Sequence, residues 1–413
     1  MKRLLSTFTG GGGLDIGFAG EFTCLKKSVN PVLHPNWIAK DMGDWVELAG
    51  TDFEVIFAND IRPDARAAWV SYFQQFYADA AERYHIVSIV DLVKQARAGL
   101  FRFSDNVDVI TGGFPCQDFS VAGKRNGFHS HRSHDGGLQA IDAPSVESRG
   151  QLYMWLREVI SIVQPKMFIA ENVKGLANMC DVKSVIEHDF ADAANGGYLV
   201  IPTEVLNAAD YGVPQSRQRI LFYGFKRSAL KPDAAVALSK TIVPDFYNPY
   251  PVQTHAFTIS HGTNLMPFVT CADAFIDLDE PDCTGDPAQM KYSTAKYLGR
   301  KSQGQTEVRM DYVGPTIRSE HHGNIEFRRL SQAHGGTHIS ELKAGLQERR
   351  LTVRECARLQ TFPDTYRCVM PGENQLPPVS ASSAYRIIGN AVPCLLGYHI
   401  AKRLEEKWDI WFI

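Results

Sequence analysis

The sequence predicts an α/β fold: a doubly wound sheet with a second, smaller domain that is irregular and partly β. In the first half of the chain, short apolar runs alternate with amphipathic stretches, which is typical of strands and helices around a largely parallel sheet. Several apolar runs end in glycine or a charged residue, and ligands of such folds bind beyond the carboxyl ends of the strands. After about Lys226 the chain is rich in Pro, Gly, Thr, Tyr and Asp, and it has no sustained helical period.

The predicted strands are RLLSTF, EVIFAND, VDVITGGF, PKMFIAEN and RILFYGF. Helical patterns lie between them, at ARAAWVSYFQQFYADAAERY and at QLYMWLREVISIV. Near the C-terminus we expect a helix at LTVRECARLQTF, for which Pro363 is a plausible stop, and a final helical stretch interrupted at residues 389–393. Residues 126–150 have no period and many small or polar residues, so we expect a long loop there.

Composition excludes several classes of protein. The chain of 413 residues contains nothing close to the roughly 18 consecutive apolar residues of a membrane span, and its first residues lack the pattern of a signal peptide. Its 8 cysteines are scattered without a C-x-x-C pair, which argues against a zinc site and against a disulfide framework. A reducing cytosol is the simplest setting for such a chain.

Charge is distributed unevenly along the chain. The formal net charge is −3, which argues mildly against a nucleic-acid binder. Residues 291–358, however, hold 13 Lys and Arg against 7 Asp and Glu. This basic stretch is compatible either with contacts to phosphates or with an ordinary solvated surface.

Two features at strand ends are typical of a nucleotide cofactor site. FTGGGG at residues 8–13 follows a strand and precedes a helical pattern, so its glycines would let a cofactor approach the backbone. Asp60 ends the EVIFAND strand, where a carboxylate can accept hydrogen bonds from ribose hydroxyls. Its distance from the glycines requires residues 24–50 to be an insertion. A glycine-rich turn that binds nothing and a helix-capping Asp60 are the alternatives.

Three further segments carry residues suited to catalysis. Cys116 follows VDVITGGF at a tight turn that could favour its thiolate. Glu171 ends the next strand, where partial desolvation would raise its pKa for proton donation. Arg217 and Arg219 alternate before the last strand, so both would face an anion or a developing oxyanion. The alternatives are an inert buried cysteine, a capping carboxylate and a salt-bridged surface pair.

Together and in this order, these segments resemble the DNA (cytosine-5) methyltransferase family. The resemblance rests on FTGGGG at 8–13, GGFPCQDFS at 112–120, ENV at 171–173, QSRQR at 215–219, RECARLQTFPD at 354–364 and GNAVP at 389–393. It covers nearly the whole chain and implies a Rossmann-like methyltransferase sheet. It also implies a catalytic domain at 1–225, a target-recognition domain at 226–370 and a C-terminal segment at 371–413 that returns to the catalytic domain.

The resemblance implies a role for each catalytic candidate. Cys116 would attack C6 of the target cytosine, because that addition makes C5 electron-rich. Glu171 would contact N3 and the exocyclic amino edge, and Arg219 would hydrogen-bond O2. Arg217 would support the site or bind a nearby phosphate. The C5 proton would then leave, with water as a candidate base, and Cys116 would be released.

The implied methyl donor is S-adenosylmethionine, and the product is S-adenosylhomocysteine. Asp60 would bind its ribose, and Ile61 would lie beside the adenine. Family members often place an Asp near the adenine amino group, whereas this chain has Ser88 there, a weaker partner. The cofactor residues that the resemblance implies are Phe8, Gly10, Gly11, Gly12, Gly13, Asp60, Ile61, Ser88, Ile89, Pro115, Leu152, Asn390 and Ala391.

The implied substrate is double-stranded DNA, whose target cytosine must be flipped out of the helix to reach Cys116. A loop at about 117–148 would close over that base. Its three closely spaced histidines give no metal site, since no cysteine or paired acidic ligand accompanies them. The candidate DNA contacts are Ser120, Lys124, Arg125, Arg300, Lys301, Arg309, Thr316, Arg318, Arg328 and Arg329.

We therefore expect a monomeric cytoplasmic enzyme, associated with the nucleoid, that is the modification half of a bacterial or phage restriction–modification pair. A cognate restriction endonuclease would act separately. A transfer-RNA methyltransferase of the same family is one alternative, but the long 226–330 region and the lack of a Cys-Phe-Thr element disfavour it. A non-catalytic DNA-binding homologue or an unrelated enzyme such as a dehydrogenase is the other, and the intact catalytic candidates disfavour both.

Overall fold

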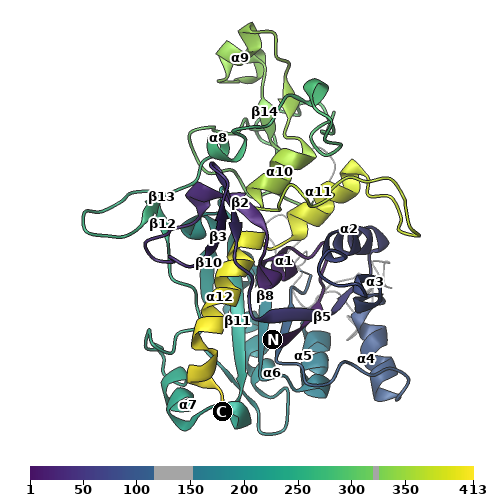
Figure 1. Cartoon of the computed structure of the whole chain (residues 1–413), viewed down its shortest axis with the longest axis vertical. Helices are drawn as coiled ribbons and strands as arrows, with labels where there is room; N and C mark the ends of the chain where they lie inside the picture. The colour runs from purple at the N-terminus through teal and green to yellow at the C-terminus, as the bar shows by residue number, and fades with distance from the viewer. Residues whose placement is uncertain (116–151, 320–324) are drawn as a thin grey trace.

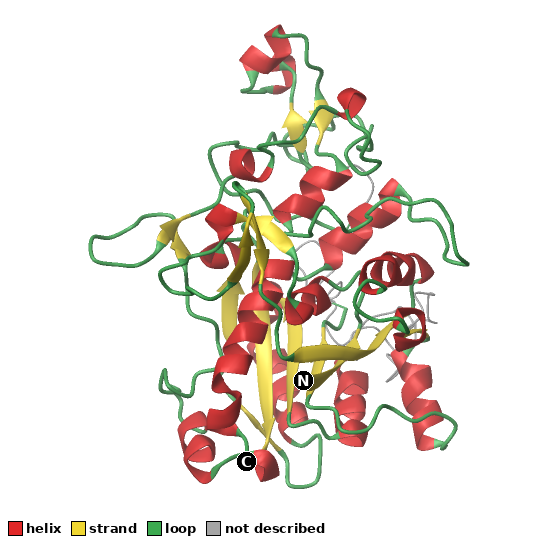
Figure 2. Ribbon diagram, viewed as in Figure 1, coloured by secondary structure: helices red, strands yellow, loops and turns green. Residues whose placement is uncertain are grey.

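The computed structural model describes residues 1–115, 152–319 and 325–413, and these residues contain an eight-stranded sheet at the centre of the larger domain (Figures 1 and 2). The strand order is β10-β11-β8-β7-β1-β5-β6, and β9 pairs with β11 beside β10. Strands β6, β5, β1, β7 and β8 are parallel, whereas β11 is antiparallel to its neighbours. The strands are β1 (Lys2–Thr7), β5 (Phe53–Asp60), β6 (Tyr84–Ile86), β7 (Val109–Gly112), β8 (Met167–Val173), β9 (Tyr198–Val200), β10 (Glu204–Asn207) and β11 (Gln218–Lys226).

Helices cover both faces of this sheet, which confirms the doubly wound α/β prediction. One hydrophobic core lies between the sheet and helices α1 (Gly13–Ala19), α2 (Pro63–Phe73) and α12 (Cys394–Trp411). A second core lies between the opposite face and helices α4 (Ile89–Arg97), α5 (Leu152–Val163) and α6 (Cys180–Ala191). Leu4 and Leu5 of β1 belong to different cores, because successive side chains of a strand point to opposite faces.

The last helix packs against the first one. A Cβ atom on Gly17 of α1 would lie 2.4 Å from the carbonyl oxygen of Cys394 at the start of α12, so glycine is needed for this close approach. Helix α11 (Ala381–Asn390) precedes α12, and the predicted interruption separates them. The C-terminal residues therefore lie beside the turn that follows β1.

Two parts of the larger domain differ from simple strand–helix alternation. The pattern predicted as one helix forms α2 and the short α3 (Ala80–Arg83), because Phe76 and Tyr77 leave the helical path to pack against the core. Residues 23–48 form a separate three-stranded sheet in the order β2-β4-β3, as expected for an insertion. Its strands are β2 (Thr23–Leu25), β3 (Ile38–Asp41) and β4 (Trp45–Leu48).

Residues beyond β11 form mostly short elements, and many of them build the upper part of the molecule in Figure 1. This agrees with the prediction of an irregular, partly β region. The elements are α7 (Pro232–Leu238), β12 (His255–Ala256), β13 (Met266–Pro267), α8 (Cys271–Ala274), β14 (Phe327–Arg329), α9 (Ile339–Lys343), β15 (Arg349–Arg350) and α10 (Val353–Leu359). Within the described ranges, no helix is both long and apolar enough to cross a bilayer.

Candidate active site

The glycine turn after β1 is fastened to the ends of two neighbouring strands. The Gly10 N–H donates to Oδ2 of Asp60 at 3.0 Å, and the Tyr84 hydroxyl donates to the Gly10 carbonyl at 2.8 Å. Phe8 and Gly10 have φ values of 52° and 55°, so the chain reverses sharply here. Burial raises the pKa of Asp60, although the Gly10 hydrogen bond opposes the shift.

The four glycines of this turn differ in how closely other protein atoms approach them. A Cβ atom on Gly11 would lie 2.3 Å from Cγ2 of Ile387, one on Gly12 would lie 2.4 Å from Cδ1 of Trp69, and one on Gly13 would lie 2.3 Å from the Val392 carbonyl oxygen. A Cβ atom on Gly10 would meet no atom within 4 Å. Protein packing therefore already requires glycine at positions 11, 12 and 13, and the contact of these glycines with a cofactor stays a prediction.

The other candidate cofactor residues surround this turn with unequal accessibility. Ile61, next to Asp60, leaves 41% of its surface exposed. Ser88 is the N-cap of α4, and its Oγ accepts a hydrogen bond from the Val90 N–H at 3.3 Å. Helix capping thus accounts for at least part of the role of Ser88. Of the remaining candidates, Phe8, Pro115 and Ala391 are half-buried, Ile89 and Leu152 are buried, and Asn390 is exposed.

Glu171 and Arg219 form a buried ion pair where β8 and β11 run side by side. Nε of Arg219 lies 2.6 Å from Oε1 of Glu171, and each residue is only 9% exposed. Burial raises the pKa of Glu171, and the charges of Arg219 and Arg217 partly oppose this shift. Glu171 therefore holds a proton more readily than a carboxyl group in water, as its place at a strand end predicts.

The end of β7 is held against the same pair. A Cβ atom on Gly113 would lie 2.9 Å from Oε2 of Glu171, so only glycine leaves room for the carboxyl group. The Asn172 side-chain amide donates to the Phe114 carbonyl at 3.1 Å. The chain then continues through Pro115 to Cys116. Cys116, Ser120, Lys124, Arg125 and the three closely spaced histidines lie outside the described residues.

Arg217 joins three segments that are far apart in the sequence. Its guanidinium is buried and donates to the carbonyl oxygens of Ile317 at 2.9 Å and Gly389 at 2.8 Å. Gln215 reinforces the joint, because its Oε1 accepts from the Ile317 N–H and its Nε2 donates to the Leu359 carbonyl. These contacts favour the supporting role predicted for Arg217 over a phosphate contact.

A family model for C-5 cytosine-specific DNA methylases matches residues 3–406 of the chain. The chain belongs to this family. It is therefore a DNA (cytosine-5-)-methyltransferase, as its motifs predict.

Several type II methyltransferases resemble this C5 methyltransferase over nearly its whole length. M.BsuRI of Bacillus subtilis is 28% identical and covers 100% of the chain and 80% of its own length. M.FnuDI of Fusobacterium nucleatum is 29% identical, with 98% and 94% covered. Among solved structures, the Schizosaccharomyces pombe Dnmt2 methyltransferase has a TM-score of 0.55 at 18% identity, with 98% and 99% covered. The Entamoeba histolytica methyltransferase EhMeth has a TM-score of 0.56 at 14% identity, with 99% of both chains covered, so these two support the fold.

Asp15, in α1 directly after the glycine turn, is a buried titratable residue that the motifs did not single out. It is 1% exposed in α1, and its Oδ2 accepts a hydrogen bond from Nε1 of Trp69 at 2.8 Å. Burial raises its pKa to about 6, although hydrogen bonds from Ser6 and Trp69 oppose the shift. The available signal was one acidic residue inside the apolar stretch LDIGFA. Among the described residues, no group of three or more His, Cys, Asp or Glu side chains is arranged to hold a metal.

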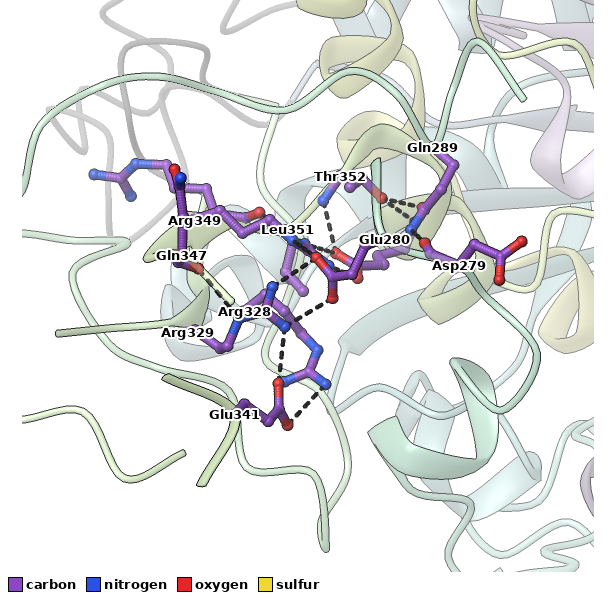
Figure 3. A network of polar contacts seen from close by, with 12 residues as sticks. Asp279, Glu280, Gln289, Arg328, Arg329, Glu341, Gln347, Arg349, Leu351 and Thr352 are labelled. Carbon is purple, nitrogen blue, oxygen red and sulfur yellow. Dashed lines mark hydrogen bonds and ion pairs between the residues drawn. The ribbon is translucent and has the colours of Figure 1, made fainter. Parts of the chain in front are cut away.

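Arg329 corrects one prediction about the DNA contacts of the methyltransferase. It is 1% exposed, and its guanidinium lies between the carboxylates of Glu280 and Glu341 (Figure 3). Burial alone would raise the pKa of Glu280, but hydrogen bonds from Arg329 and Arg349 outweigh it and lower the pKa to about 2. The Arg329 guanidinium is therefore buried and paired with two carboxylates, so it cannot reach a phosphate. Arg328, which also pairs with Glu341, is largely covered.

The remaining candidates for DNA contact differ in how far their side chains are exposed to solvent. Arg300, Lys301 and Arg309 are exposed, and Arg309 pairs with Asp311 at the surface. Arg318 is partly exposed and lies 3.4 Å from Glu326. The Thr316 hydroxyl donates to the Ser216 carbonyl at 2.6 Å, so it ties the second domain to the segment before β11. Exposure leaves Arg300, Lys301 and Arg309 as the best-placed cations of this set.

Proposed function

We propose that the enzyme transfers a methyl group from S-adenosylmethionine to C5 of a cytosine flipped out of a specific duplex sequence, through a covalent bond between Cys116 and C6. The observation that supports this most strongly is the buried Glu171–Arg219 pair beside the turn that leads to Cys116. A carboxylic acid and a guanidinium side by side complement the N3 and O2 atoms of cytosine. The pair would therefore select this base and polarise it.

In this mechanism Glu171 and Arg219 stabilise the charge that nucleophilic addition creates. As the Cys116 thiolate donates an electron pair to C6, negative charge develops over N3 and O2. Glu171, with its raised pKa, donates a proton to N3, and Arg219 donates an N–H hydrogen bond to O2. After methyl transfer, loss of the C5 proton to a base and departure of the thiolate restore the ring and free Cys116.

The residues at the glycine turn fit S-adenosylmethionine. Asp60 keeps acceptor capacity beyond the Gly10 and Arg62 N–H groups, which suits ribose hydroxyls. The exposed side chain of Ile61 offers an apolar surface to a base, and the open side of Gly10 leaves room beside the backbone. Bound there, the cofactor would supply an electrophilic methyl group on a sulfonium.

The names of the relatives suggest the biological setting. Because they are type II methyltransferases, we extend to this chain a restriction–modification role, with a cognate endonuclease that acts separately. A monomer in the cytoplasm, close to the nucleoid, is part of this proposal. So is the division into a catalytic domain at 1–225, a target-recognition domain at 226–370 and a returning segment at 371–413.

A trapped covalent complex tests the mechanism. The recognised site is first mapped by bisulfite sequencing of a host that expresses the gene, and 5-fluorocytosine then replaces the target cytosine. Because the C5 fluorine cannot leave as a proton does, the wild-type enzyme should remain attached to the duplex in a denaturing gel. Cys116→Ser should give no adduct, whereas Cys283→Ser, at an exposed cysteine, should behave as wild type. An adduct that survives Cys116→Ser would contradict the assignment.

A further inference from the structure

A basic loop in the second domain is anchored to other segments at both of its ends. Residues 293–306 lie between two isolated β-bridges, one from Tyr292 to Thr352 and one from Glu307 to Phe327. The loop contains Lys296, Arg300 and Lys301 and no acidic residue, and all three cations are exposed. Compact surface loops of this length are often functional.

Arg350 fills the centre of this loop. It is 1% exposed, and each of its five N–H donors has an acceptor. Four acceptors belong to the loop: the carbonyls of Ala295 at 2.9 Å, Lys296 at 3.2 Å and Gly304 at 2.7 Å, and Oε1 of Gln305 at 3.3 Å. The fifth is the Ile325 carbonyl. The loop therefore turns its carbonyls inward to one buried guanidinium and its cationic side chains outward.

Side-chain contacts fix the position of the loop further. Oε1 of Gln305 also accepts from the Leu298 N–H at 2.8 Å, which closes the tip of the loop on its own C-terminal end. Tyr297 stacks on His334 with ring centroids 4.2 Å apart, and the guanidinium of Arg350 lies 4.0 Å from the centre of the Phe327 ring. These contacts fix the backbone at Lys296 and on both sides of the segment that carries Arg300 and Lys301.

The strand that supplies Arg350 is anchored to the body of the enzyme by its neighbour. Arg349 and Arg350 are adjacent in β15, so their side chains point to opposite faces. Arg349 binds Glu280 and Glu355, and Glu280 also binds Arg329, which forms the network in Figure 3. Glu355 lies in α10, whose last residue, Leu359, contacts Gln215 of the catalytic domain. The loop is thus tied through β15 and α10 to the segment that also holds Arg217.

We propose that residues 293–306 form a DNA-reading surface and that Arg350 is the positioning residue that holds it in its binding conformation. This rests on the proposed function, because it takes duplex DNA as the substrate. The exposed cations Lys296, Arg300 and Lys301 match the negative charge of the phosphates. A loop that is ordered before it binds loses less conformational entropy on binding, so affinity and sequence discrimination both depend on Arg350.

A residue that positions the loop and a residue that contacts a phosphate should affect the salt dependence of DNA binding differently. Binding is measured on a duplex with the mapped site, over a salt series, and methylation kinetics are measured on that duplex and on duplexes altered at one base pair. Lys301→Gln should weaken binding to all duplexes alike and reduce the slope of log K against log salt by about one. Arg350→Met should leave that slope unchanged, because Arg350 does not touch a phosphate.

The kinetic result expected for Arg350→Met separates a positioning role from a merely structural one. Its KM for DNA should rise about tenfold, its preference for the mapped site should fall, and its kcat and cofactor affinity should stay within about twofold of wild type. Arg350→Lys, with three donors, should restore part of the loss. Arg102→Gln, which removes an exposed cation of the catalytic domain, serves as the charge control and should change none of these quantities.

Three results would overturn the inference. They are an unchanged KM and preference in Arg350→Met, a parallel loss of kcat and cofactor affinity in that variant, and an unchanged salt slope in Lys301→Gln. If Arg350→Met does not fold, Gln305→Leu removes an acceptor of Arg350 and of Leu298, and the same expectations apply to it. A wild-type protein that binds duplex DNA but methylates none would contradict the proposed function. The salt series on a mixed-sequence duplex, with wild type, Lys301→Gln and Arg350→Met, would still test the loop.

Discussion

The ends of the catalytic strands and the 293–306 loop are held in place by hydrogen bonds from different groups. Glu171 and the turn before Cys116 are positioned by hydrogen-bonded strands, because β7 and β8 are adjacent and parallel and β11 pairs with β8 in register. The loop has almost no strand pairing of its own. Its carbonyl oxygens instead accept hydrogen bonds from the buried guanidinium of Arg350. The residues proposed for catalysis are therefore positioned by the backbone of the sheet, whereas the loop proposed to read DNA is positioned by side chains. A loop held in this way can change its sequence without disturbing the sheet.

Glu171→Gln tests the catalytic side of this comparison and should have the largest effect. Gln keeps the shape of the side chain but has no proton to give to N3, so kcat should fall by about 10²–10⁴-fold. Single-turnover methylation of the mapped duplex measures this change. Cofactor affinity serves as the control and should remain close to that of wild type. A kcat within about tenfold of wild type would show that Glu171 does not supply the proton.

Arg217→Met tests the joint between the two regions. It removes two hydrogen bonds from a buried charge, to the carbonyls of Ile317 and Gly389. Since bonds to charged groups contribute about 1.5–3 kcal/mol each, the free energy of unfolding should fall by about 3 kcal/mol or more. Arg309→Met, at a side chain 67% exposed, is the matched control and should change stability by less than about 0.5 kcal/mol. Equal effects of the two substitutions in denaturant titrations would contradict the role of Arg217 as a joint.

Asp15→Asn should have the smallest effect, and the effect should depend on pH. The folded protein holds the Asp15 proton up to a pKa of about 6, against 3.8 in the unfolded chain, so wild type loses stability as pH rises through this window. Relative to Asp15→Asn, which does not titrate, wild type should lose about 1.4 kcal/mol between pH 5 and pH 8. Thermal unfolding of both proteins at several pH values measures the difference. A constant difference across this range would contradict the raised pKa.

The difference between the two regions also explains which features could be predicted from the sequence. Glycine and polar residues at the ends of apolar runs mark the edge of a parallel sheet, so Glu171, Arg219 and Asp60 became candidates from their positions. The resemblance to the methyltransferase family then decided between these candidates and their structural alternatives. The residues next to an arginine in the sequence do not indicate which carboxylates it pairs with in the folded protein. Arg329 was therefore predicted as a DNA contact, although it is buried against Glu280 and Glu341.

The same limit applies to contacts between residues that are remote in the sequence. Gly11 was predicted as a cofactor residue, and no pattern indicated that it also makes room for Ile387. The part that Arg350 plays in the loop depends on carbonyl groups, and every residue type carries a carbonyl. No pattern of side chains could therefore reveal it.

The most direct test of this account is the chemical identity and location of the methyl group that the enzyme transfers. Purified protein is incubated with isotopically labelled S-adenosylmethionine and either mixed-sequence duplex DNA or a transfer-RNA pool, and the nucleosides are separated by mass spectrometry. We expect labelled 5-methylcytosine in the duplex, confined to one recurring sequence, and none with Cys116→Ser. Label in transfer RNA alone, or no label at cytosine C5 of DNA, would contradict it.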